Sequence, residues 1–355
     1  VLLDVYEAEG DGIYGVLHEL VSLGLVETRA EYSEMTGGDL GLVYRPAGRL
    51  LAGEVLESMP EERRTQLHEK IALFLRETGT APIVYGYFHL ARGGRLREAA
   101  LNGYELFQQL LQRKRLSAVN YLNESYMAAG LDRHLPPELR LKLLLEIGQY
   151  FALIGRMESA EALYRSCRQE TEGTALAGNF RSLAVEAARR ECEILEKKGE
   201  FLRAETLLEE ALELHGDHIL AHERSKLYND LAWVHYRLGH FDRSWENCLL
   251  VLKLLEKKQH PCEVAQAYNL MGAINWNRSK YEEAIQCHNR CLALREETHD
   301  DLGVAASYNN LGLVYRSMGK VQQAIESFRA SMEIKRRSNN LNGLAAAHLN
   351  IALTF

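Results

Sequence analysis

Histidine is the residue type whose spacing in this sequence comes closest to a metal site. His215, His218 and His222 can share one helical face, and histidines one turn apart on a helix can chelate zinc. Gly216 and Asp217 lie among them at a turn, however, and no H-E-x-x-H arrangement completes a ligand set. We therefore expect surface histidines and no metal site.

The cysteines and acidic residues do not form a catalytic set either. Cys287 and Cys291 are one helical turn apart beside His288, but position 291 falls in a column of small residues, which indicates a small buried hydrophobic residue. Three acidic pairs occupy outward helical positions beside Lys and Arg, as on a solvated face: Glu209-Glu210, Glu282-Glu283 and Glu296-Glu297. No nucleophile is accompanied by a base and an orienting group. We expect no catalysis and no cofactor.

Composition indicates a folded, helix-rich protein. The 355 residues are 46% hydrophobic and 26% charged, which excludes global disorder, and six prolines are few for a β-rich architecture. Six cysteines without a C-x-x-C pair fit a reducing cytoplasm. No apolar run is long enough to span a bilayer. The sequence starts without an initiator methionine or signal peptide, so we expect a piece of a longer protein.

The last third of the sequence repeats with a period of 40 residues. When the repeats are aligned, Tyr228, Tyr268 and Tyr308 fall at one equivalent position, which we call a column, and Gly239, Ser279 and Gly319 form another. Small residues form two further columns: Ala232, Gly272, Gly312 and Ala352, and then Ser244, Ala284 and Ala324 twelve positions later. A 44-residue step extends the pattern upstream, so that five units fit between about residues 137 and 340 and a sixth begins at Leu341.

These columns describe pairs of antiparallel helices. Small residues let the two helices approach closely, and the Gly or Ser column marks a left-handed turn after which Phe241, Tyr281 and Val321 begin the second helix. The pattern, clearest from Tyr308 to Ile334, resembles the tetratricopeptide repeat in its form of about 40 residues. The resemblance implies a mostly α fold, a right-handed α-solenoid, over residues 137–355. Residues 80–136 look like an irregular helical connector of related spacing.

Asparagine forms the most informative polar column. Asn229, Asn269 and Asn309 recur every 40 residues on the first helix of each unit. First helices line the concave side of such superhelices, and an amide can both donate to and accept from the backbone of an extended peptide. The column resembles the peptide-contacting asparagines of kinesin light chains. Nearby aromatic and charged residues complete a predicted protein-binding or peptide-binding site: Lys226, Trp233, Tyr236, Arg237, Gln266, Trp276, Asn277, Leu313 and Arg316. In the alternative interpretation, the asparagines make polar contacts between repeats and the tryptophans are core residues.

Residues 1–79 follow a different pattern. Positions 13–23 have helical periodicity, and Val26–Tyr32 and Leu40–Arg45 alternate like two strands joined by a glycine turn at residues 35–39, which together predict a winged-helix domain. This segment holds 15 acidic against 7 basic residues, and its helix 13–23 offers no Arg, Lys, Asn or Gln to read bases. DNA-binding regulation is therefore the least favoured function.

The run from Arg64 to Ala72, R-x-x-L-H-x-x-I-A, resembles the region after the nucleotide-binding module in signal-transduction ATPases with numerous domains. This resemblance covers about residues 13–110 and implies an upstream NTPase in cis. No G-x-x-x-x-G-K-[ST] sequence is present, so this chain carries no P-loop of its own. We expect a non-catalytic sensor arm that binds a peptide or protein and signals to the ATPase. The alternative is a stand-alone adaptor or scaffold.

Overall fold

The computed structural model describes residues 26–32, 40–46, 59–66, 68–69, 90–113, 115–172, 178–255, 259–338 and 340–354. The chain divides into two compact units, residues 1–150 and 151–355. The division falls inside one helix. None of the described helices is both long and apolar enough to cross a membrane.

The first unit begins with a two-stranded antiparallel hairpin. Strand β1 (Val26–Tyr32) pairs with β2 (Leu40–Pro46), in a register that places Val26 opposite Pro46 and Tyr32 opposite Leu40. The two strands lie where the alternating pattern predicted them. The predicted helix 13–23 and the glycine turn 35–39 lie outside the described residues, so the winged helix stays a prediction.

The numbered helices of the described part of the first unit are α5 (Leu96–Gln112), α6 (Leu116–Ala128), the short 3-10 helix η2 (Leu131–His134) and α7 (Pro137–Leu153), which extends into the second unit. Close packing between α5 and α6 depends on Gly103, because a Cβ there would lie 2.3 Å from the Tyr126 ring. The Tyr126 hydroxyl donates to the Ala100 carbonyl at 2.7 Å and anchors the pair.

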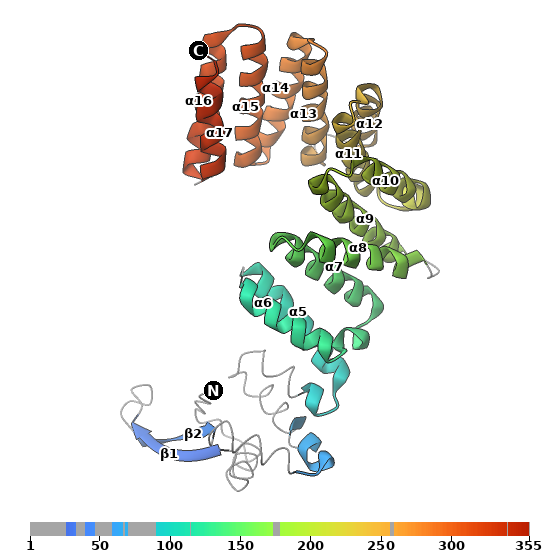
Figure 1. Ribbon diagram of the computed structural model, residues 1–355, viewed down its shortest axis with the longest axis vertical. Coiled ribbons are helices and arrows are strands. Elements are labelled where there is room, and N and C mark those ends of the chain that lie inside the picture. The colour runs from blue at the N-terminus through green and yellow to red at the C-terminus, as the bar shows by residue number, and fades with distance from the viewer. Residues whose placement is uncertain are drawn as a thin grey trace. The chain divides into compact units, whose positions relative to one another are not determined.

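The second unit is a stack of antiparallel helix pairs (Figure 1). Its helices are α8 (Met157–Glu172), α9 (Gly178–Lys198), α10 (Phe201–His215), α11 (Ala221–Arg237), α12 (Phe241–Leu254), α13 (Pro261–Asn277), α14 (Tyr281–Glu297), α15 (Asp301–Ser317), α16 (Val321–Arg337) and α17 (Leu341–Ala352), with the short η3 (Gly216–His218) after α10. The predicted fold class, a mostly α solenoid of helix pairs, is confirmed. The second helices α12, α14 and α16 begin at the residues that the 40-residue period predicted.

The turns inside the helix pairs have the predicted left-handed backbone. Gly199, Gly239 and Gly319 have φ of 78°, 78° and 71°. Ser279 occupies the equivalent position with φ 58°, a conformation that costs a residue with a Cβ roughly 1 kcal/mol. The preceding helix therefore ends at the same point in every unit, and this keeps the helix pairs in register.

The two columns of small residues bring the paired helices together. Ser244 is fully buried and its hydroxyl donates to the Ala232 carbonyl twelve residues earlier, at 2.7 Å. In the last complete pair, a Cβ on Gly312 would lie 2.5 Å from the Phe328 ring. Large side chains such as Phe328 fill the space that the glycine leaves between the two helices.

Successive first helices lie closer to one another than successive second helices do. Contacts join α9 to α11, α11 to α13 and α13 to α15, whereas the second helices are in contact mainly with first helices. In a curved stack, the layer whose helices approach each other most closely is the inner one. We call α9, α11, α13, α15 and α17 the inner layer.

Candidate functional site

Every residue of the predicted binding site belongs to three consecutive helices of the inner layer, and these helices, α11, α13 and α15, are labelled in Figure 1. Helix α11 carries Lys226, Asn229, Trp233, Tyr236 and Arg237; α13 carries Gln266, Asn269, Trp276 and Asn277; α15 carries Asn309, Leu313 and Arg316. The 40-residue period places these positions on one face, and side-chain hydrogen bonds connect the helices across it.

Two of the predicted asparagines are paired across neighbouring inner helices. Asn310 donates from Nδ2 to Oδ1 of Asn269 at 2.9 Å, and Asn350 donates in the same way to Asn309 at 2.9 Å. All four side chains are half-buried. An amide has two donor hydrogens and two acceptor lone pairs, so each member of a pair keeps hydrogen-bonding capacity for a ligand.

Asn229 has a different environment from Asn269 and Asn309. It is 7% exposed, and its Nδ2 donates to the Glu263 carbonyl at 3.1 Å and to Oε1 of Gln266 at 3.4 Å. Asn229 therefore connects α11 to α13, which is the contact between repeats that the alternative interpretation describes. Gln266 is exposed and shares in this contact.

Trp233 forms an aromatic patch with its neighbours on α11. The indole is 38% exposed, and its ring stacks on Tyr236 at 5.7 Å between centroids. The Arg237 guanidinium lies 5.6 Å from the Trp233 ring and 4.6 Å from the Phe201 ring. The indole N–H donates to Oε2 of Glu196 on α9 at 2.8 Å. We call Trp233, Tyr236 and Arg237 the α11 patch.

The second predicted tryptophan extends this patch onto the next helices. Trp276 is half-buried, and its indole N–H donates to the Ser317 hydroxyl at 2.8 Å. Asn277 donates to the Tyr236 hydroxyl at 2.8 Å and so joins α13 to the α11 patch. Neither tryptophan is a fully buried core residue.

Three further predicted residues make fewer contacts. Leu313 and Lys226 are half-buried, and no ion pair involves Lys226 among the described residues. Arg316 is half-buried, and its Nη1 has no hydrogen-bond partner within the described part of the chain. Arg316 Nη1 is thus a buried donor without a partner among the described residues, and Lys226 and the exposed Arg237 are the unpaired cations of this face.

Sequence reasoning missed an acidic residue beside the asparagine column, Asp230 on α11. Asp230 accepts from Nε of Arg189 at 2.6 Å, which joins α9 to α11. Burial raises the pKa of Asp230 to about 6 against the opposing effect of Arg189, and burial likewise raises the pKa of Glu196. The signal was present: Asp230, Asn310 and Asn350 all occupy the position directly after the asparagine column.

Among the described residues, none of those considered for catalysis or metal binding belongs to a group of three close potential metal ligands. The His222 ring stacks on that of His260 at 5.4 Å, while His215 is buried. Burial raises the pKa of Cys287 and of Cys291, so both thiols stay protonated at neutral pH. The three acidic pairs are exposed on the second helices, as predicted.

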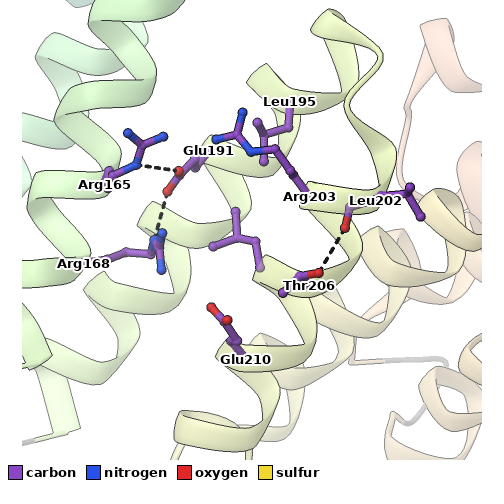
Figure 2. A pocket seen from close by; sticks show the side chains of 9 residues that line it. Arg165, Arg168, Glu191, Leu195, Leu202, Arg203, Thr206 and Glu210 are labelled. Carbon is purple, nitrogen blue, oxygen red and sulfur yellow. Dashed lines mark hydrogen bonds and ion pairs between the residues drawn. The ribbon is translucent and has the colours of Figure 1, made fainter.

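A separate hollow of about 520 Å³ lies between α8, α9 and α10 (Figure 2). Its arginines are already paired with acidic residues: Glu191 accepts from Arg168 at 2.9 Å and lies 3.5 Å from Arg165, and Arg203 lies 2.9 Å from Glu161. Because these charges satisfy one another, we assign the hollow to the contact between successive helix pairs within the second unit.

Comparisons with known proteins agree with this architecture. Residues 263–337 match the tetratricopeptide repeat family. A search of curated proteins gave no match. Among solved structures, the chain is similar to RapI in its apo form, with a TM-score of 0.53 and 12% identity over 72% of this chain and 70% of that one. It is also similar to BtubC from P. vanneervenii, with a TM-score of 0.50 and 19% identity over 69% of this chain and 92% of that one.

A third similar structure spans nearly the whole chain. It is PH0952 from Pyrococcus horikoshii, described as a signal transduction ATPase with numerous domains that has a tetratricopeptide repeat sensor. The TM-score is 0.52 with 16% identity, and the match covers 98% of this chain and 51% of that one. At these identities the likeness concerns the fold. The second unit is therefore a tetratricopeptide-type solenoid, a fold that generally binds proteins or peptides and is typically non-catalytic.

Proposed function

We propose that this chain is a non-catalytic protein-interaction arm that binds an extended peptide, or an exposed segment of a protein, on the inner layer. The observation that carries the proposal is the α11 patch, with its partly exposed tryptophan, next to half-buried amides that keep free hydrogen-bonding capacity. Aromatic residues and arginine beside polar groups have the composition of binding hot spots.

The inner layer offers two kinds of interaction to an extended segment. Asn269 and Asn309 lie 40 positions apart on adjacent helices, so their amides can bond peptide groups at two points along the segment. Each such bond contributes a net of about 0.5–1.5 kcal/mol. The α11 patch must then supply an apolar anchor, and we expect a dissociation constant on the order of micromolar.

The finer proposal is that the arm is the sensor of a signalling ATPase whose nucleotide-binding module precedes residue 1. The run from Arg64 to Ala72 supports this assignment, and the fold likeness to PH0952 over 98% of the chain is consistent with it. Ligand on the inner layer would change the angle between successive helix pairs. The resulting rigid-body shift would favour one state of the ATPase over the other.

Selection from a displayed library of extended peptides on the immobilised chain tests the binding function. Trp233→Ala and the double substitution Asn269→Ala with Asn309→Ala should each weaken a selected peptide by about tenfold, the equivalent of about 1.4 kcal/mol. Glu282→Ala, at an exposed position of the second helix α14, is the matched control and should bind unchanged. Equal loss in the control, or none in the inner-layer variants, would refute the assignment of the site.

A further inference from the structure

A group of potential metal ligands lies at the C-terminal end of α11, away from the histidines that the sequence analysis considered. Glu205 comes from α10, His235 from α11 and His240 from the turn before α12. Oε1 of Glu205 is 2.9 Å from Nε2 of His235 and 3.9 Å from Nδ1 of His240. One ligand atom from each of the three residues lies within 4.8 Å of the others.

These distances are close to those of a zinc site. Zinc binds nitrogen and carboxylate oxygen at about 2.0–2.2 Å in tetrahedral geometry, which separates ligand atoms by roughly 3.3 Å. The two measured separations from Glu205 bracket that value. His240 is 47% exposed on a turn and can move inward, whereas His235 is 3% exposed and held in place. Two imidazoles and one carboxylate leave the fourth position to water.

The group also contains a residue that can orient the buried imidazole. Asn247 contacts Nδ1 of His235 at 3.0 Å, on the side of the ring away from Glu205. Nδ2 of Asn247 also donates to the Arg243 carbonyl at 3.1 Å, which identifies it as the donor side of the amide. Nδ1 of His235 therefore accepts a hydrogen bond from Asn247, and in the metal-free protein the ring carries its proton on Nε2 and donates to Glu205. Metal binding moves this proton to Nδ1, where the Asn247 carbonyl oxygen can accept it once the amide has turned.

A cation already lies beside the carboxylate. Nη1 of Arg243 is 2.9 Å from Oε1 of Glu205, the oxygen that both histidines approach. The Arg243 side chain is 59% exposed, so it can swing into solvent when another cation binds. Arg243 therefore competes with a metal for Glu205 and sets an upper limit on the affinity.

We propose that Glu205, His235 and His240 bind one zinc ion, with Arg243 as its competitor and Asn247 as the support of His235. The ion would clip α10 to the turn between α11 and α12 and thereby join two successive helix pairs. The same last turn of α11 carries Tyr236 and Arg237, so zinc would also hold the α11 patch in a fixed orientation. This inference does not depend on the proposed peptide binding.

Zinc titration by isothermal calorimetry tests the site on protein that lacks a histidine tag and has been dialysed against a chelator. We expect one equivalent with a dissociation constant on the order of micromolar. Cobalt(II) should show the visible absorption bands of a tetrahedral site. Because His235 is buried and its removal endangers folding, the variants are His240→Ala and Glu205→Gln, checked for folding by circular dichroism.

His240→Ala and Glu205→Gln should each weaken zinc binding by at least about tenfold, while Arg243→Ala should tighten it. The double substitution His222→Ala with His260→Ala removes the other close histidine pair and should leave the affinity unchanged. The proposal is overturned if neither the wild-type chain nor Arg243→Ala binds zinc. It is equally overturned if His240→Ala and Glu205→Gln bind like wild type, or if removing His222 and His260 abolishes binding.

Discussion

His288 is a buried histidine in a place where the next repeat has phenylalanine. Its side chain is 2% exposed and lies against Gly272, where a Cβ would be 2.6 Å from the imidazole. Phe328 occupies the same place against Gly312 in the following helix pair. The Nδ1 atom of His288 has no hydrogen-bond partner among the described residues. His288→Phe should therefore fit the site and remove a buried polar atom that is not satisfied.

The size of the effect follows from proton linkage. Burial lowers the pKa of His288 to about 4, whereas an unfolded histidine titrates near its usual value of about 6.5. The folded protein therefore binds this proton more weakly than the unfolded chain does. The contribution of His288 is complete above pH 6.5 and is lost as the pH falls towards 4. At about 1.4 kcal/mol for each pKa unit, the loss is about 3 kcal/mol at pH 4 and about 2 kcal/mol at pH 5.

Urea unfolding followed by circular dichroism measures this difference. At pH 7.5, we expect His288→Phe to be more stable than wild type by about 1 kcal/mol, because no polar atom is buried without a partner. At pH 5, its advantage should grow by about 2 kcal/mol. Phe328→His is the converse variant and should introduce the same pH dependence one repeat later. The reasoning is refuted if wild type and His288→Phe lose stability in parallel between pH 7.5 and pH 5.

Three further predictions concern the packing, a buried hydrogen bond and an ion pair, two of them with a matched control substitution. Gly312→Ala should lower the free energy of unfolding by about 1–3 kcal/mol, because its Cβ would lie 2.5 Å from the Phe328 ring. The control Gly319→Ala has no atom near its Cβ and should lower the free energy of unfolding by only roughly 1 kcal/mol, because its backbone is left-handed. Tyr126→Phe should cost the first unit about 0.5–1.5 kcal/mol in urea unfolding, because the buried bond to the Ala100 carbonyl is lost; an unchanged midpoint would contradict this. The hydrogen bond from Lys198 lowers the pKa of Glu161, so Glu161→Gln should lower the free energy of unfolding at pH 7. This loss of stability should shrink below pH 4.5, where Glu161 of the wild type becomes protonated as well. The control Glu158→Gln, at an 85% exposed side chain, should change the free energy of unfolding little at either pH.

Helix positions were predictable because local chemistry determines them. The glycines at 199, 239 and 319 require a left-handed turn, and the small residues at 272 and 312 require close approach, so both features leave a periodic signal. The hairpin strands were predictable from alternation for the same reason. For the candidate site, the sequence predicted only which residues share one face of the inner helices, because the 40-residue period determines the side of a helix on which a residue lies.

The partners of each side chain were not predictable, because they depend on the angle between successive helix pairs. Asn229 and Asn269 occupy the same column, yet the first donates to the Glu263 backbone and the second accepts from Asn310. Trp233 bonds the preceding inner helix through Glu196, whereas Trp276 bonds the following one through Ser317. The group of Glu205, His235 and His240 spans three segments with no shared spacing.

The most direct test of the account is hydrogen–deuterium exchange on the chain with and without a peptide selected from the library. Binding on the inner layer predicts slower exchange in α11, α13 and α15, with the largest change at the C-terminal turn of α11, and little change in α12, α14 and α16. Protection confined to the second helices, or spread equally over both layers, would contradict the assignment of the inner layer as the docking surface.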